Sequence, residues 1–167
     1  RNQVSRLGDA DSLWLSKDPT ADEIMDEINA RCPDAKEIVF CGYGEPTERL
    51  DVVLEVARRI RSETDARIRL DTNGLGNLIN GRDIVPDLAK VLDSISISLN
   101  APDSEEYVCL CKPVFGEASY PALLKFIDEA RKVIPTTVSV VGGSISEESE
   151  DRCRRMAEEW GVHFRVR

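Results

Sequence analysis

Histidine is almost absent from this sequence, with His163 as its one representative in 167 residues. Hydrolytic sites built on a Cys–His or Ser–His pair need a histidine beside the nucleophile. His163 lies at the start of a predicted strand, at the opposite end from the polar loops, so such a pair is not expected. Gly42-x-Gly44 and Gly74-x-Gly76 each lack the third glycine of a dinucleotide-binding fingerprint, and no strand is followed by a P-loop.

Cysteines are few and irregularly placed: the five are Cys32, Cys41, Cys109, Cys111 and Cys153. Their lack of a regular framework favours a reducing cytoplasm over a disulfide-stapled secreted domain. The Cys109-x-Cys111 pair offers two thiolates, whereas an iron–sulfur cluster normally needs four protein ligands. No histidine cluster completes a zinc site. We expect Cys41 and Cys153 to lie in or near the core.

Long apolar runs are also missing, so a membrane-spanning helix is not expected. The chain has 22 basic and 31 acidic residues and a net charge of −9, the opposite sign from a surface that binds duplex nucleic acid. Hydrophobic residues at 41% and charged residues at 32% are typical of a soluble globular protein. The length fits one domain over residues 1–167, and we expect it to be cytoplasmic.

What the sequence does contain is an alternation of short apolar strands and amphipathic helices. Strands are predicted to begin near residues 37, 67, 94, 137 and 163. Helices are predicted over about 20–32, 48–62, 86–91, 103–132 (one short and one long) and 146–160. The first of them opens with a capping box, and Gly161 ends the last. This order predicts right-handed βαβ units on a parallel sheet, either open or a partial barrel, and hence an α/β fold.

In parallel α/β folds the functional groups collect on the loops that follow the strands. The loops here carry small, hydroxyl and amide side chains and a single carboxylate after the first strand. They read Gly42-Tyr43-Gly44-Glu45-Pro46-Thr47, Asp71-Thr72-Asn73-Gly74, Ser98-Leu99-Asn100-Ala101 and Gly142-Gly143-Ser144. Such groups favour a polar small molecule held by many neutral hydrogen bonds. Each loop on its own could also be a simple turn.

Three of these segments together resemble the motifs of radical S-adenosylmethionine (SAM) enzymes. Phe40-Cys41-Gly42-Tyr43-Gly44-Glu45-Pro46-Thr47 looks like the Gly-Glu-Pro motif that ends the second barrel strand of that superfamily. Arg69-Leu70-Asp71-Thr72-Asn73-Gly74 resembles the turn after the third strand, and Ser96-Ile97-Ser98-Leu99-Asn100-Ala101 the fourth-strand segment. Val138-Ser139-Val140-Val141 lies where the fifth strand flanks adenine in the family.

The resemblance implies an incomplete (β/α)6-type partial TIM barrel with parallel strands, its first strand missing. It also implies a SAM site made by the Gly-Glu-Pro motif and by polar residues of the next strands. Those site residues are Gly42, Tyr43, Gly44, Glu45, Pro46, Thr72, Asn73, Ser98, Asn100 and Ser139. In the family a reduced [4Fe-4S] cluster cleaves SAM to a 5′-deoxyadenosyl radical, which abstracts hydrogen from a substrate. The implied partners are SAM and an electron donor such as a flavodoxin or ferredoxin.

The sequence departs from the family at the cluster, since it has no Cys-x3-Cys-x2-Cys loop. Arg1-Asn2 resembles the residues just after that loop, so the cluster ligands are expected upstream of Arg1 and this fragment is expected to be inactive. Three further stretches are similar to the narrower group associated with TatD-type nucleases. They are Gly8-Asp9-Ala10-Asp11-Ser12-Leu13-Trp14-Leu15, Gly74-Leu75-Gly76-Asn77-Leu78-Ile79-Asn80-Gly81-Arg82 and Leu110-Cys111-Lys112-Pro113. A functional link to such a nuclease is therefore expected.

Two alternatives stay open at this stage. One is a non-catalytic nucleotide-binding or scaffold module. The other is an aldolase-like barrel enzyme, which would want a Schiff-base lysine at a strand end, where this sequence has none. Asp9 and Asp11 could order a loop over the barrel mouth or contact a substrate, and the sequence favours neither role.

Overall fold

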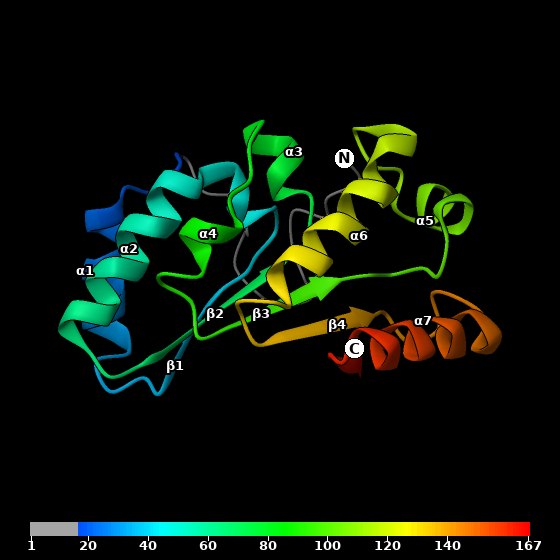
Figure 1. Cartoon of the computed structure of the whole chain (residues 1–167). Coiled ribbons are helices and arrows are strands. Elements are labelled where there is room, and N and C mark those ends of the chain that lie inside the picture. The colour runs from blue at the N-terminus through cyan, green and yellow to red at the C-terminus, as the bar shows by residue number, and fades with distance from the viewer. Residues whose placement is uncertain (1–16) are drawn as a thin grey trace, which may run out of the picture.

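The computed structural model describes residues 17–167, so Asp9 and Asp11 lie outside the described residues. Five strands form one sheet (Figure 1), and each begins within a residue of its predicted position. They are β1 (Glu37–Phe40), β2 (Arg67–Thr72), β3 (Ser94–Ser98), β4 (Thr136–Val140) and β5 (His163–Val166). The strands are parallel and follow the order β1-β2-β3-β4-β5, which confirms the predicted α/β fold.

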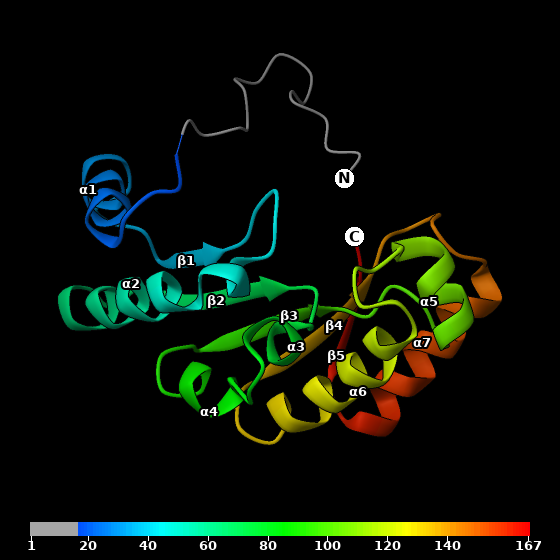
Figure 2. The same ribbon diagram turned by 90° about the horizontal axis from the view of Figure 1, so that it is seen from above.

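The register shifts as the sheet is crossed. Ser94, the first residue of β3, pairs with Arg69 in the middle of β2, and His163 at the start of β5 pairs with Thr137 of β4. Such a stagger accompanies a sheet that curves toward a barrel. Figure 2 shows the sheet from above, with α2, α4 and α6 following its outer side. The arrangement is that of a partial barrel.

Seven α-helices and two short 3₁₀ helices lie within residues 17–167. They are α1 (Ala21–Arg31), η1 (Pro46–Arg49), α2 (Leu50–Glu63), α3 (Gly76–Asn80), α4 (Val85–Leu88), α5 (Ser104–Cys111), η2 (Gly116–Ala118), α6 (Ser119–Ala130) and α7 (Glu147–Trp160). None of the helices in this described range is long and apolar enough to cross a membrane. The predicted helix over 48–62 is preceded by η1, and α3 lies in a segment where no helix was predicted.

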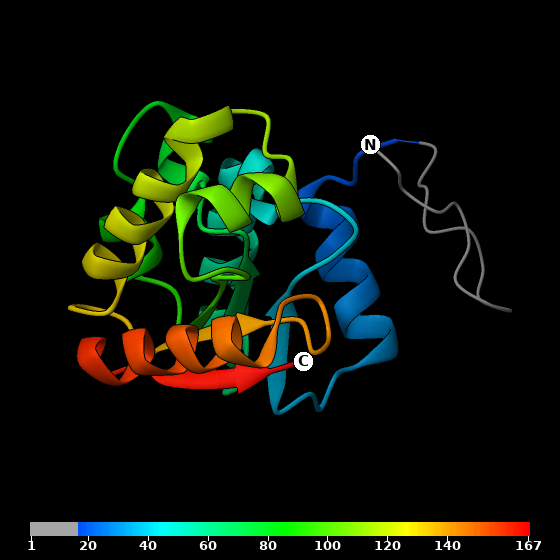
Figure 3. The same ribbon diagram turned by 90° about the vertical axis from the view of Figure 1, so that its right-hand side faces the viewer.

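The helix ends follow the predicted capping chemistry. The Glu23 N–H donates to the Thr20 hydroxyl at 3.2 Å, while the Thr20 N–H donates to the Glu23 carboxylate at 2.9 Å. At the other end of the chain, Ser146 caps α7, and Gly161 ends it with φ of 67°. Figure 3 shows α7 lying alongside β5.

The core lies between the sheet and the helices. Alternate residues of the strands point toward the helices and are buried among apolar side chains of α2, α4 and α6. The buried strand residues on this side are Ile68, Leu70, Thr72, Ile95, Ile97, Thr136, Val138 and Val140. Phe164 of β5 also faces the helices, since the Arg154 guanidinium of α7 stacks 4.7 Å from its ring centroid.

The other face of the sheet, which we call the inner face, is mainly polar. The alternation of the strands and their register assign its residues. They are Glu37, Val39, Arg67, Arg69, Asp71, Ser94, Ser96, Ser98, Thr137, Ser139, His163, Arg165 and Arg167. Parallel strands buried on both faces are continuously apolar, so this alternation marks a face that lines an interior rather than a second core.

The amino-terminal ends of β2 and β3 are joined by Asp93. Its carboxylate accepts the backbone N–H of Ile68 at 2.7 Å and lies 3.0 Å from the guanidinium of Arg61. Arg61 also donates to the carbonyl of Val91 at 3.2 and 3.0 Å. These contacts stabilise the amino-terminal end of the sheet, which is opposite the loops that follow the strands.

One prediction about the cysteines is confirmed and another is wrong. Cys153 of α7 is buried in the core, as expected. Cys41 is exposed, because β1 ends at Phe40 and the chain leaves the sheet there. The general tendency of free cysteines to be buried therefore does not hold at Cys41.

Candidate functional site

Glu45 connects the loop after β1 to the loop after β2. It immediately precedes η1, whose first residue is Pro46. One carboxylate oxygen accepts hydrogen bonds from the N–H and hydroxyl of Thr47, at 3.1 and 2.8 Å, and from the Thr72 hydroxyl at 2.7 Å. The other accepts the backbone N–H of Asn73 at 2.7 Å. With four protein donors, the carboxylate fixes the geometry of both loops.

The turn after β2 is held by its own side chains. Thr72 is buried, and its hydroxyl also accepts the N–H of Gly74 at 3.1 Å. The amide oxygen of Asn73 accepts the N–H of Leu75 at 2.8 Å, as in an Asx turn. Gly74 has φ of +76°, and a Cβ there would lie 2.9 Å from the side chain of Ile97. Only glycine fits this position without rearrangement.

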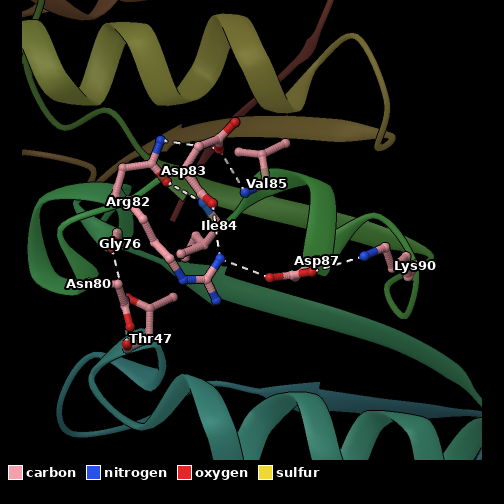
Figure 4. A network of polar contacts seen from close by, with 10 residues as sticks. Thr47, Gly76, Asn80, Arg82, Asp83, Ile84, Val85, Asp87 and Lys90 are labelled. Carbon is pink, nitrogen blue, oxygen red and sulfur yellow. Dashed lines mark hydrogen bonds and ion pairs between the residues drawn. The ribbon is translucent and has the colours of Figure 1, made fainter.

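A second polar network supports the same two loops from the side of α3 (Figure 4). The Asn80 amide donates to the carbonyl of Thr47 at 3.0 Å and to that of Gly76 at 2.9 Å. Further along this segment, the Arg82 guanidinium donates to the Asp87 carboxylate at 2.8 Å. The short helix α3, which was not predicted, therefore supports these loops through its asparagine side chain.

The loop over Gly42–Pro46 presents backbone to solvent. A Cβ built at Gly42 or Gly44 would meet nothing within 4 Å, so a ligand could approach this backbone closely. Tyr43 between them is exposed. On the helix side of the loop lies a cavity of about 330 Å³, which reaches Phe40 and Val52.

The ends of β3 and β4 carry three more predicted site residues. Ser98 pairs in register with Ser139, and both lie on the inner face. Asn100 follows with φ of 61°, an uncommon conformation outside glycine that Asn tolerates better than most residues. Its amide nitrogen lies 3.6 Å from the sulfur of Cys111, and burial raises the pKa of that thiol, with the amide contact opposing the rise.

Two polar atoms at these strand ends are buried and have no hydrogen-bond partner. They are the amide oxygen of Asn100 and the hydroxyl of Ser139. Ser139 is fully buried, and Asn100 is partly exposed. A buried polar atom without a partner costs free energy, on the order of 1–3 kcal/mol, and in a native protein it needs an explanation such as an absent ligand.

The predicted site residues thus fall into two groups. Glu45 and Thr72 are committed to protein contacts, and Thr72 points toward the helices rather than the inner face. Asn73 lies one residue beyond the last β2–β3 pair, which brings it level with Ser98 and Ser139. The strand ends are therefore adjacent, although the side chains do not all face the same way.

The prediction missed charged residues of the inner face. The Arg69 guanidinium lies 3.3 Å from Asp71 and 3.8 Å from Glu37, and Arg165 and Arg167 occupy β5 and its end. Their signal is the period-two spacing of polar residues within the strands, whereas only the loops were considered. The position of His163 needs a correction too: register places it on the inner face in the row of Asp71, because the strands are staggered.

Comparison with known families agrees with this geometry. The family model of the radical SAM superfamily matches residues 9–157, most of the chain. The chain belongs to the radical SAM superfamily. None of the curated proteins compared matches the sequence.

Two solved structures share the fold of this radical SAM domain. One is a domain of pyruvate-formate lyase-activating enzyme from Bacteroides vulgatus, with a TM-score of 0.55 and 15% identity, covering 80% of this chain and 99% of that one. The other is archaeal TYW1, with a TM-score of 0.59 and 16% identity, covering 87% of this chain and 47% of that one. At such identities the likeness concerns the fold alone.

The superfamily implies SAM and a [4Fe-4S] cluster, and the described residues fit the first of these. The unpartnered oxygens of Asn100 and Ser139 and the open backbone of Gly42 and Gly44 suit a ligand with amino, hydroxyl and heterocyclic groups. The cluster does not fit them, since residues 17–167 contain no group of three side chains placed to hold a metal. No step through the cluster is therefore assigned to these residues.

Proposed function

We propose that residues 1–167 form the SAM-binding part of the core domain of a radical SAM enzyme. The observation that carries this proposal is the pair of unpartnered buried oxygens, on Asn100 and Ser139, at adjacent strand ends of a radical SAM fold. A purely structural scaffold gives no reason for such oxygens, whereas a non-catalytic nucleotide-binding module would use them in the same way, and the SAM-cleavage test below separates it from the enzyme. When bound together, SAM and a reduced [4Fe-4S] cluster supply radical chemistry to a substrate that the described residues do not identify.

The described residues would act by binding and orienting SAM. The backbone of Gly42 and Gly44, the exposed Tyr43 and the adjoining Pro46 form one side of the site, and Glu45 fixes this loop. Ser98, Asn100 and Ser139 offer hydroxyl and amide groups on the other side. Asn73 lies between them in the sheet order. Thr72 contributes through its hydrogen bond to Glu45.

The finer assignments belong to the same proposal. The three stretches quoted above suggest the group associated with TatD-type nucleases, and a link to such a nuclease follows from that resemblance alone. A flavodoxin or ferredoxin would supply the electron. A cytoplasmic location fits the unpaired cysteines.

The test uses full-length protein purified without oxygen, with its cluster reconstituted. We expect a brown protein that binds SAM and cleaves it on reduction. Ser139→Ala should weaken SAM binding about 2-fold to 12-fold, because one neutral hydrogen bond is lost. The same change should not destabilise the unliganded protein, since that hydroxyl has no partner to lose.

Asn100→Gly is the matched variant at the second position, because glycine accepts the positive φ and only the amide is removed. Ser62→Ala is the control, as Ser62 is an exposed residue of α2 on the outer surface. The proposal would be contradicted if the full-length protein took up no cluster. It would also be contradicted if the Ser139 and Asn100 variants bound SAM as tightly as the Ser62 variant.

A further inference from the structure

Two arginines at the carboxyl end of the chain, on the inner face of β5, have no carboxylate partner among residues 17–167. Arg165 lies on β5, and Arg167 continues that strand by a backbone hydrogen bond to Val140 at 2.9 Å. Phe164 points toward α7, and successive side chains of a strand point to opposite faces of the sheet. Arg165 and Arg167 therefore both face away from the helices. The Arg167 guanidinium confirms this direction, since it donates to the Ser98 hydroxyl at 3.0 Å.

Two further arginines point inward from β2. Arg67 lies at the amino-terminal end of that strand, where its charge helps to lower the pKa of Asp93. Arg69 lies 3.3 Å from Asp71 and 3.8 Å from Glu37, so its charge is matched by two carboxylates. Arg165 and Arg167 have no comparable ion pair with any described residue. In a chain of net charge −9, two uncompensated cations on one face call for an anion.

Arg165 also has a buried atom that lacks a partner. Its Nε is buried and makes no hydrogen bond, and it shares this state with the hydroxyl of Ser139. The two residues pair in register across β4 and β5, and Ser98 is the next member of the same row. Residues two apart on a strand lie roughly 7 Å from each other, so the guanidinium of Arg167 can reach the same small group.

We infer that Arg165 and Arg167, with the Ser139 hydroxyl, bind an oxyanion, a carboxylate or phosphate, of a ligand on the inner face. A guanidinium donates two parallel hydrogen bonds to such a group, and the serine hydroxyl adds a third. The inference deepens the proposed function and rests on it, because it concerns the same face. The oxyanion has two possible sources: the carboxylate of SAM, or an acidic group of the substrate.

The experiment uses cluster-loaded full-length protein and its Arg165→Gln, Arg167→Gln and Arg165→Lys variants. Arg155→Gln is the control, since Arg155 is exposed on α7 and loses the same charge. Each protein is titrated by calorimetry with SAM, with decarboxylated SAM, and with pyrophosphate and citrate as probes of an acidic substrate. Thermal melts of each variant establish that it is folded.

If SAM supplies the oxyanion, Arg165→Gln weakens SAM binding about 10-fold to 100-fold and leaves decarboxylated SAM unchanged. If the substrate supplies it, SAM binding is unchanged, and binding of pyrophosphate or citrate falls by the same factor. Arg165→Lys restores part of either loss, because the charge is kept without the paired donors. Folded Arg165 and Arg167 variants that bind every probe like Arg155→Gln would overturn the inference.

Failure of the proposed function gives a different pattern. A wild-type protein that binds neither SAM nor decarboxylated SAM contradicts the SAM assignment, while the pyrophosphate and citrate titrations still test the arginines. A second pattern contradicts only the oxyanion site. In that pattern the wild-type protein binds and cleaves SAM, and the arginine variants bind all four probes as tightly as wild type does.

Discussion

The carboxylate of Glu45 accepts the backbone N–H of Asn73 at 2.7 Å, which joins residues 28 positions apart in the sequence. The carboxylate therefore links the loops after β1 and β2 into one hydrogen-bonded unit. In the radical SAM resemblance both loops belong to the SAM site. Glu45 is thus placed to position the site, whether or not it touches the ligand itself.

Replacing Glu45 with glutamine should disturb this unit without changing its shape. The amide would place donor hydrogens opposite the donors of Asn73 or of Thr47 and Thr72. We expect a loss of about 1–3 kcal/mol in unfolding free energy and weaker SAM binding. The measurements are denaturant unfolding and SAM calorimetry. Glu48→Gln is the control because Glu48 is exposed, and equal behaviour of the two variants would contradict the role of Glu45.

Gly74→Ala should be among the most destabilising single-methyl changes in this chain. Its φ of +76° costs about 1–2 kcal/mol for alanine. The new Cβ would also collide with the side chains of Leu123 and Ile97, which adds about 1–3 kcal/mol for overpacking. Gly81→Ala is the matched control, with φ of +62° and nothing within 4 Å. Denaturant unfolding should show a larger loss of unfolding free energy for Gly74→Ala than for Gly81→Ala. Equal losses would mean that the side chains of Leu123 and Ile97 move aside without an energetic penalty.

The sequence predicted the strands well because their signal is local. Short runs rich in β-branched residues, with Pro before them and Gly after them, define β1 and β4 without reference to the rest of the chain. The helix α3 was missed since Gly76–Asn80 is too short to have a hydrophobic period, and its amides are explained only by contacts with the loop after β1. Long-range contacts of this kind are invisible in a single sequence.

The strand ends could be located from the sequence, but the direction in which their side chains point could not. The stagger between strands decides which residues lie side by side. Two residues illustrate this: His163 begins its strand and nevertheless stands in the row of Asp71, near the end of β2. The stagger arises from closure of the curved sheet, so no strand encodes it alone.

The rate of alkylation should differ between exposed and buried cysteines. Burial, with nearby acidic groups adding to it, raises the pKa of Cys153 to about 12, so its thiol stays protonated at pH 8. Cys32, Cys41 and Cys109 are exposed. We expect iodoacetamide at pH 8 to modify these three first and to spare Cys153, as measured by peptide mass spectrometry. Guanidinium-unfolded protein is the control, in which all five react. Modification of Cys153 in native protein as fast as Cys109 would mean that α7 detaches readily.

The Asp93 contact predicts a dependence of stability on pH. Partial burial tends to raise the pKa of this carboxyl, but the Ile68 N–H and the Arg61 guanidinium outweigh it, and the net shift is downward from 3.8. A carboxyl whose pKa is lower in the folded state stabilises the fold above its unfolded pKa. That stabilisation disappears as pH falls through the folded value.

Asp93→Asn keeps an oxygen that can accept the Ile68 N–H and removes the charge that faces Arg61. The variant should therefore be less stable than wild type by about 1 kcal/mol at pH 7. The difference should shrink as pH falls below the unfolded pKa of about 4 and through the lower folded pKa, as wild type loses the same charge by protonation. Urea unfolding at a series of pH values measures it. Asp65→Asn serves as the control, since Asp65 is exposed, and a pH-independent difference for Asp93→Asn would show that its amide packs badly rather than that the charge matters.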